Sequence, residues 1–575
     1  MSMLQNPLSG LSRSLKPLVP FLVFVIRRFP LVWWIIILTL ILIFLEYSVL
    51  SLMIPLASDN VSTNEGMTWL SLIWDKALIL FGLSANRMTW LWIFLTLLCV
   101  RTSLGYLHLL LSTWVAKQVH SYLSERNFRR VLIEEPITEI YRRSIGYYLR
   151  LAGDDTFRAG SIVLTSAQTL ANLTSVIVGF AILFFFSYTV FVWTMLFLLV
   201  CGVLVGIALQ IMLKSNARSV EFSARENTMF VEAINGLRSI RSLGAQTFLA
   251  GAYSKNNKLY VFEQFKIEAI RSGIRYLPGV LALFAGAVSL WPGSTHYSGV
   301  TASFFFAAIT LLIRIFVSLG SFVNSATTLL NDLRAANDIS EVTGYEPPKR
   351  LSAVHPINTI QFKNIELCGI DYGYMKGHDV LSGLNLSMNR GQVIAVIGPS
   401  GSGKSTLADL LLGLVQARSG IIKANNIVIS AADLGRHVVL VEQQARIFSS
   451  SVRENILLGF TADDELIWKV LKLLNLDDYV HKLPGQLDHK FNYQGANLSG
   501  GQKQRLSIAR ALVRRPSVLI LDEATSALDS DTRNIVINSV REFMSEGIMI
   551  MITHDTTLVL DADIVCQLSQ HAQSE

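Results

Sequence analysis

A glycine-rich loop in the second half of the chain has the residue types and spacing needed to hold a chain of phosphates. The run Gly398–Ser405, GPSGSGKS, fits the pattern G-x-x-x-x-G-K-[ST]. It follows the apolar run Val393–Ile397, which predicts a buried parallel strand, and precedes Thr406–Leu414, which predicts a helix. Glycines in this setting let backbone N–H groups face phosphate oxygens, and the helix N-terminus adds partial positive charge.

Separate roles follow for the residues of this loop. Lys404 is expected to contact the β- and γ-phosphates of ATP, and the Ser405 hydroxyl is expected to hold Mg²⁺. ATP and Mg²⁺ are therefore the expected cofactors. The residues expected to bind the nucleotide here are Gly398, Pro399, Ser400, Gly401, Ser402, Gly403, Lys404, Ser405 and Thr406.

A second apolar run ends in two carboxylates. Val518–Leu521 predicts a strand whose C-terminal end carries Asp522 and Glu523. We expect Asp522 to be a Mg²⁺ ligand and Glu523 to polarise the attacking water as a general base. Strands often end in solvated charge without any function, but the phosphate loop in the same chain favours the catalytic interpretation.

Between these two segments lies Leu498–Gln502, LSGGQ, followed by the predicted helix Lys503–Arg514. LSGGQ is the signature of the ATP-binding cassette (ABC) family, and residues 356–560 resemble its ATPase domain. In that family two cassettes face each other, and each ATP lies between one phosphate loop and the other chain's signature. The resemblance therefore implies a homodimer, with a heterodimer as the alternative, and it implies that the signature binds the partner's ATP through Ser499, Gly500, Gly501 and Gln502.

The resemblance also assigns roles to residues outside these motifs. Gln443 corresponds to the glutamine that links Mg²⁺ and the attacking water to the membrane domain. His554 corresponds to the histidine that contacts the γ-phosphate, although a histidine after a strand is usually only a satisfied polar residue. Tyr374 corresponds to the aromatic side chain that stacks on adenine, with Tyr372 as the rival, and Ser526–Asp529 corresponds to the loop that contacts the opposing subunit. The catalytic set is then Glu523, His554, Gln443 and Lys404, and the metal set is Ser405, Gln443 and Asp522.

The first 340 residues have a different composition. Long apolar runs alternate there with short polar stretches, and several runs approach the ~20 residues that cross a bilayer. We predict an interfacial helix near 13–30, an outer connection over 55–88 that is either amphipathic or a plain loop, and short crosswise cytoplasmic helices near 137–147 and 226–237. The predicted spans are 31–54, 89–115, 162–187, 189–213, 272–291 and 303–330.

The distribution of charge predicts the orientation. The net charge of +7 is concentrated before the first span and in the segments 101–160 and 213–276, whereas the short connections near 187–189 and 292–300 lack charged residues. This is the positive-inside pattern. It predicts an inner-membrane protein with a cytoplasmic N-terminus and ATPase domain, and it argues against a nucleic-acid partner. The four cysteines form no C-x-x-C pair, so no metal or redox site is expected from them.

These observations predict an all-α six-helix transmembrane domain of the ABC exporter type followed by an α/β P-loop ATPase cassette. The expected domains are 1–335, a linker over 336–355, and 356–575. Soluble cassette ATPases lack membrane spans, and importers usually keep spans and cassette on separate chains, so the fused order resembles an exporter.

Two arginines interrupt apolar spans: Arg101 in the second and Arg314 in the sixth. Counting from the outer helix ends at 1.5 Å per residue places both about 20 Å down. Counting Glu46 from the inner side of the first span places it near the outer third, as a poor partner for either. Unpaired arginines at one level predict an anionic ligand, phosphate or pyrophosphate, with snorkelling or helix-carbonyl contacts as the alternative.

The segment Leu45–Asp59, together with Arg101 and Arg314, resembles the bacterial flippases of lipid-linked oligosaccharides. That resemblance implies a membrane-lipid partner and a polyprenyl-pyrophosphate-linked glycan moved outward. A further arginine of those flippases is replaced here by Ser321. Export of a peptide or other amphipathic product is the alternative.

Overall fold

The computed structural model describes residues 18–57, 87–186, 188–289, 302–343, 362–374 and 378–569. The chain divides into two compact units, Met1–Lys349 and Arg350–Glu575, which are described separately here. The predicted amphipathic outer piece within 55–88 lies almost entirely outside the described residues. Residues 336–343, expected to begin the linker, instead continue the last long helix of the first unit.

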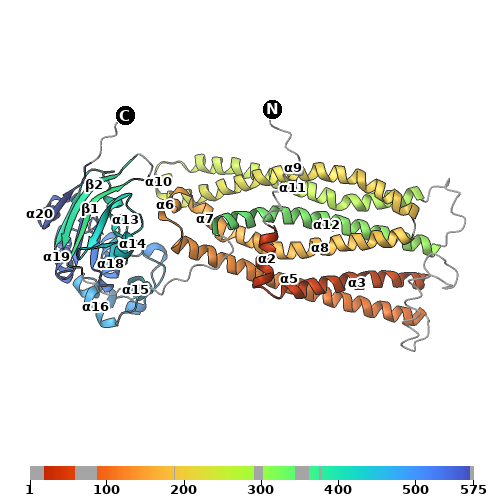
Figure 1. The fold of residues 1–575 in the computed structure, drawn as a ribbon, viewed down its shortest axis with the longest axis horizontal. Coiled ribbons are helices and arrows are strands. Elements are labelled where there is room, and N and C mark those ends of the chain that lie inside the picture. Colours follow the sequence, from red (N-terminus) through yellow and green to blue (C-terminus); the bar gives the residue numbers. More distant parts are fainter. Residues whose placement is uncertain are drawn as a thin grey trace. The chain divides into compact units, whose positions relative to one another are not determined.

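The first unit is a bundle of long helices (Figure 1). Each of the six predicted spans lies in its own helix, and the bundle begins with a shorter helix, α2 (Leu18–Arg28). Four stretches of the described residues are long and apolar enough to cross a membrane. The long helices are α3 (Val32–Ala57), α5 (Arg87–Ile133), α8 (Asp154–Phe186), α9 (Tyr188–Asn235), α11 (Gln246–Ser289) and α12 (Ala302–Thr343).

The basic segments are helical continuations of these spans, as predicted. Helix α9 has 48 residues, which is about 70 Å at 1.5 Å per residue and more than twice the thickness of a hydrocarbon core. Helices α9 and α11 run side by side (Figure 1). Asn256 donates to the Phe222 carbonyl at 3.0 Å, and Gln264 donates to the Ser219 hydroxyl at 2.7 Å. These bonds join the two helices beyond the predicted spans.

The short helices between the long ones differ in part from the prediction. The segment 137–147 forms two helices, α6 (Ile137–Arg142) and the start of α7 (Ile145–Ala152), because the chain is extended at Arg143 and Ser144. The prediction of a short helix at 226–237 is wrong. Helix α9 continues unbroken until Gly236, and the short helix α10 (Leu237–Ser242) follows it. The segment 226–235 contains neither glycine nor proline, so no residue in it breaks the helix before Gly236.

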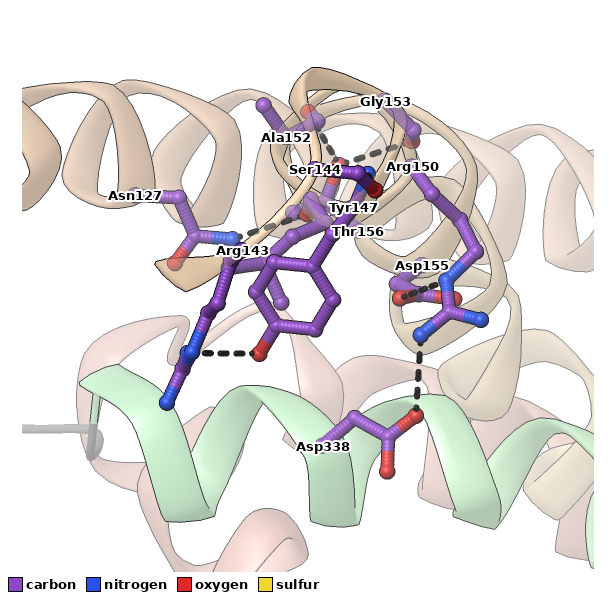
Figure 2. Close-up of polar contacts among 11 residues, drawn as sticks. Asn127, Arg143, Ser144, Tyr147, Arg150, Ala152, Gly153, Asp155, Thr156 and Asp338 are labelled. Atoms are coloured by element: carbon purple, nitrogen blue, oxygen red, sulfur yellow. Dashed lines mark hydrogen bonds and ion pairs between the residues drawn. The ribbon is translucent and has the colours of Figure 1, made fainter. Parts of the chain in front are cut away.

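Helix α7 is tied to three long helices by polar contacts (Figure 2). Asn127 of α5 donates to the carbonyl of Leu151 at 2.9 Å. Arg150 pairs with Asp155 of α8 at 3.2 Å and with Asp338 of α12 at 3.7 Å. These contacts, together with the buried cluster around Leu151, fix the connection between α5 and α8 against the bundle.

The second unit has two sheets. A four-stranded antiparallel sheet has the order β2-β1-β4-β5, and a five-stranded parallel sheet has the order β6-β7-β8-β3-β9. The antiparallel strands are β1 (Asn364–Tyr372), β2 (Leu381–Asn389), β4 (Ser419–Ala424) and β5 (Ile427–Ile429). The parallel strands are β3 (Val393–Ile397), β6 (Val438–Val441), β7 (Val518–Asp522), β8 (Ile548–Ile552) and β9 (Ile564–Gln567).

Helices surround this parallel sheet, whose central strands are almost completely buried (Figure 1). The helices important for the site are α13 (Lys404–Leu411) and α18 (Gly500–Val513). The remainder are α14 (Ala431–Gly435), α15 (Val452–Leu457), α16 (Asp464–Leu473), α17 (Asp477–His481), α19 (Ser530–Phe543) and α20 (Thr556–Leu560), with single 3₁₀ turns at Gln486–Asp488 and Tyr493–Gly495.

Candidate functional site

The parallel sheet brings the predicted catalytic segments to one edge. Strands β6, β7, β8 and β3 are adjacent and parallel, so their carboxyl ends lie at the same edge. The phosphate loop follows β3, and Asp522 ends β7. Gln443 and His554 each come two residues after the end of a strand, β6 and β8 respectively. Residues more than 150 positions apart in the sequence therefore meet in one place.

The phosphate loop has the backbone that its glycines predict. Gly401 and Gly403 have φ angles of 82° and 92°, in the left-handed region that favours glycine. A Cβ atom on Gly403 would lie 2.9 Å from the Leu381 side chain. The Lys404 ammonium donates to the carbonyls of Gly398 at 2.7 Å and Pro399 at 2.9 Å. The lysine charge is therefore held over the loop where phosphates would bind.

Because Gly403 combines a strained φ with a close neighbour, Gly403→Ala should weaken ATP binding by about tenfold or more. A fluorescent-nucleotide titration of the purified protein measures this. Gly251→Ala in α11 is the control, since a Cβ there meets no atom within 4 Å. Equal affinities in the two variants would contradict the assigned loop geometry.

Glu523 contacts two of the other three predicted catalytic side chains, Gln443 and His554. Gln443 Nε2 donates to Glu523 Oε2 at 2.5 Å, and His554 Nε2 lies 3.3 Å from Glu523 Oε1. Glu523 itself has a φ of 45°, a conformation that non-glycine residues adopt rarely and that clusters at functional sites. Its backbone N–H donates to the Ile552 carbonyl at 3.0 Å, which anchors this turn to β8.

The carboxylates at this edge crowd one another. Burial raises the pKa of Asp522, and the negative charges of Glu523 and Glu442 raise it further, while Lys404 opposes them. Burial also raises the pKa of Asp409, and the negative charge of Asp522 raises that pKa further. Several carboxylates therefore lie at this edge with one lysine, Lys404, to offset their negative charge. A divalent cation fits such an environment. Glu442 and Asp409 are site residues that sequence reasoning missed.

Among the described residues, no group of three or more His, Cys, Asp or Glu side chains could hold a metal ion. The predicted Mg²⁺ ion would instead be held by Asp522, by the hydroxyl of Ser405 and by phosphate oxygens, because Mg²⁺ in phosphate sites takes only one or two carboxylates. The ion would neutralise charge on the phosphates.

Both candidate adenine-stacking rings lie beside the phosphate-loop helix. The Tyr374 ring is 48% exposed, and its hydroxyl lies 3.3 Å from the Thr406 hydroxyl. Tyr372 packs edge-to-face against it with ring centroids 5.3 Å apart, and burial raises the pKa of Tyr372. The more exposed ring, Tyr374, has the freer face for a base. Its role stays a prediction.

The signature residues form the first turn of α18. Ser499 accepts from the Gln502 N–H at 3.2 Å, and Gln502 Oε1 accepts from the Ser499 N–H at 2.9 Å, a complete capping box. Gly500 and Gly501 pack on the loop that contains Ala527, where a Cβ on Gly501 would lie 3.3 Å from the Ala527 carbonyl. The signature therefore needs glycine for packing inside its own chain.

Gln504 is a further residue that the sequence reasoning missed. It donates to the Ser526 hydroxyl at 3.1 Å and accepts from the Ala527 N–H at 2.9 Å. These two hydrogen bonds tie the signature helix to the segment Ser526–Asp529. Gln504 could have been found from the sequence, because it is a polar residue one helical turn after the signature glycines. In the structure it is buried.

In the first unit the structure brings Arg101 and Arg314 together but contradicts the prediction that they are unpaired. Glu46 of α3 forms ion pairs with Arg101 of α5, at 3.4 Å, and with Arg314 of α12. The error came from counting depth from the ends of apolar runs. The arginines were counted from the outer ends of their spans and Glu46 from the inner end of its span. Counted from the outer helix ends, Glu46 lies 11 residues before Ala57 in α3 and Arg101 lies 14 residues after Arg87 in α5, which are similar depths.

Two family models match the chain. The model described as ABC transporter transmembrane region matches residues 32–319, half of the chain, and the model described as ABC transporter matches residues 381–526. This chain belongs to the ABC transporter family.

Relatives and solved structures agree with this assignment. An uncharacterized ABC transporter ATP-binding protein of Bacillus subtilis is 32% identical over 62% of this chain and 62% of its own length. A putative export ATP-binding/permease protein of Rickettsia bellii is 29% identical over 80% of this chain and 81% of its own. The structure of a bacterial Atm1-family ABC exporter with ATP bound matches with a TM-score of 0.74 and 21% identity, over 94% of this chain and 93% of that one, which shows a shared fold.

The architecture predicted from the sequence is confirmed: a helical transmembrane domain precedes an α/β ATPase cassette. In this ABC transporter the cassette binds ATP, and its hydrolysis is coupled to transport. The arrangement at the sheet edge accounts for that chemistry. The phosphate loop and Glu523, which contacts Gln443 and His554, lie at the same edge of the sheet. The predicted roles of the loop in holding the nucleotide and of Glu523 as a base for water stay predictions.

Proposed function

We propose that this ABC transporter is a homodimeric exporter or flippase that moves a phosphate-bearing amphipathic lipid, such as a lipid-linked oligosaccharide, from the cytoplasmic side outward. Mg²⁺ and ATP drive the cycle, and the cassette lies in the cytoplasm beneath the inner membrane. The single observation that carries the substrate class is the convergence of Arg101 and Arg314, from different helices, on one carboxylate. A place that holds one anion between two guanidinium groups is chemically suited to a phosphate.

The location of this arginine pair supports a cavity rather than a lipid-facing position. Intramembrane charges are costly and normally face the bundle interior or a water-filled path. Arg101 and Arg314 come from helices that both pack on α3 and α8, and their side chains are about a third exposed. Each therefore keeps N–H donors that Glu46 does not use.

A second copy of this chain is supported by the extensions of α9 and α11. These helices expose large aromatic side chains well beyond the predicted spans, on a surface that would otherwise face water. Apolar surface of this kind marks a protein interface. The signature also needs a phosphate loop from another chain, which a homodimer supplies. The exposed aromatic residues are Phe230, Phe248, Phe262 and Phe265.

The direction of transport is supported by analogy. The Rickettsia bellii relative is named as an export ATP-binding/permease protein, and the fused order of membrane domain and cassette is that of exporters. We therefore infer outward movement.

The test removes the arginine pair without leaving a buried charge. In proteoliposomes, Arg101→Gln/Arg314→Gln/Glu46→Gln should reduce movement of a polyprenyl-linked, phosphate-bearing glycan to the opposite leaflet by tenfold or more. Basal ATP hydrolysis should stay within about twofold, because none of these residues lies in the cassette. Replacing both arginines by lysine should restore transport only in part, since lysine keeps the charge but loses the fork.

The matched control is Arg129→Gln/Arg225→Gln, which removes two exposed arginines, each paired only within its own helix. Leaflet accessibility of the labelled glycan is measured for all variants side by side. Equal transport by the wild type and the triple variant would make the cluster structural. Transport of a peptide, but not of the lipid, would assign the alternative cargo.

A further inference from the structure

Glu46 bridges two arginines with separate oxygens. Its Oε2 faces Arg101 and its Oε1 faces Arg314, so one carboxylate joins α3 to both α5 and α12. The Glu46 side chain is only 13% exposed, whereas Arg101 and Arg314 are 33% and 30% exposed. The Glu46 carboxylate is therefore the more buried group of the cluster, and the two guanidinium groups are the more accessible ones.

The cluster has one positive charge in excess. Segments 32–54, 89–115 and 303–330 contain Glu46, Arg101 and Arg314 as their only Asp, Glu, Lys or Arg residues. One carboxylate cannot neutralise two guanidinium groups or satisfy their ten N–H donors. Among the described residues, Arg314 Nε is buried without a hydrogen-bond partner. An uncompensated charge inside a membrane domain requires a counter-ion during at least part of the transport cycle.

Hydroxyl groups lie next to the cluster. Tyr47, which follows Glu46, donates to the Ser175 carbonyl of α8, and the Ser175 hydroxyl lies 3.1 Å from the Ser318 hydroxyl of α12. Ser318 is one helical turn from Arg314. These hydroxyl contacts join α3, α8 and α12 at positions within one helical turn of Glu46 and Arg314.

We propose that Glu46 is the internal counter-ion that sets the charge selectivity of this site, so that the cluster with its net charge of +1 takes a headgroup with a single negative charge, a phosphodiester, in preference to a diphosphate with two. This inference rests on the proposed function and refines its substrate class. A phosphodiester brings the site to neutrality. A diphosphate would leave one negative charge in excess at low dielectric.

The proposal makes Glu46 a specificity determinant with a predictable sign. Glu46→Gln keeps the shape of the side chain and changes the net charge of the cluster from +1 to +2. The preference between the two headgroups should then invert. Glu46→Gln combined with Arg101→Gln returns the net charge to +1, and the original preference should return although both ion pairs are gone.

The experiment uses the full-length protein in phosphatidylcholine nanodiscs. Three probes are titrated against ATPase activity: a polyprenyl phosphodiester-linked hexose, a polyprenyl diphosphate-linked hexose, and inorganic phosphate. We expect the phosphodiester lipid to stimulate wild type at about tenfold lower concentration than the diphosphate lipid, and Glu46→Gln to reverse this order. Glu125→Gln, which removes an exposed carboxylate paired only with Arg129 in its own helix, is the matched control.

The outcomes separate this inference from the proposed function. In one outcome, either lipid stimulates the wild type and the stimulation disappears in the Arg101→Gln/Arg314→Gln/Glu46→Gln variant, but wild type and Glu46→Gln show the same preference. That outcome would overturn the role of Glu46 and keep the proposed function. No response of wild type to either lipid would overturn both. A response to inorganic phosphate equal to that of the lipids would assign a soluble anion instead. If Glu46→Gln fails to fold, Glu46→Asn takes its place, because it also gives the cluster a net charge of +2. An unchanged preference in that variant would overturn the role of Glu46.

Discussion

Replacing Glu523 by glutamine should lower steady-state ATP hydrolysis by roughly 10²- to 10⁴-fold, the range that a general base contributes, while ATP still binds. An amide cannot accept the proton of the attacking water. The substitution preserves the size of the side chain, so Gln443 and His554 keep a hydrogen-bonding neighbour at the same place. The phosphate loop and Lys404 are untouched, and bound nucleotide should therefore accumulate unhydrolysed.

Phosphate release and the ATP-to-ADP ratio of protein-bound nucleotide measure the two halves of this prediction. Glu546→Gln is the matched control, because Glu546 is an exposed carboxylate of the same domain that pairs with Arg390. Turnover close to wild type in Glu523→Gln would remove Glu523 from the role of base.

The cassette was the more predictable part of this protein. Parallel strands buried on both faces are continuous apolar runs, so the positions of β3, β7 and β8 follow directly from the sequence. Each of these runs is followed by residues of a recognisable type: the phosphate loop, Asp522 with Glu523, and His554. The order of the strands then brings these segments together, as the structure shows.

The membrane half was less predictable. The ends of an apolar helix can be recognised in the sequence, but few residues within it indicate which residues of a neighbouring helix lie at the same depth. Hydropathy places the spans within several residues, but it does not give the vertical register between neighbouring helices. The pairing of Glu46 with Arg101 and Arg314 depends on that register. Likewise, the signature glycines indicate a family, but their packing on Ala527 and the bonds of Gln504 require the fold.

Ser499→Arg should abolish ATP hydrolysis in the homodimer while each cassette still binds ATP. Ser499 caps α18 and is exposed, far in sequence from the phosphate loop. In the proposed homodimer it would act on the ATP of the facing cassette. A bulky cation at this position would block closure of two cassettes on ATP. Loss of the cap alone costs about 1 kcal/mol, which Ser499→Ala reproduces without the bulk.

Mixing the two inactive proteins distinguishes action between chains from action within one chain. In a dimer of Ser499→Arg with Glu523→Gln, one composite site has an intact base from the first chain and an intact signature from the second, and the other site has both defects. If the signature acts between chains, co-expression should restore activity to about a quarter of wild type, since half of the dimers are mixed and one of two sites works in each. If the signature acts within its own chain, every cassette carries one defect and the mixture stays inactive. Recovered turnover in purified mixed dimers, isolated through two different affinity tags, would therefore establish both the dimer and the trans arrangement of its sites.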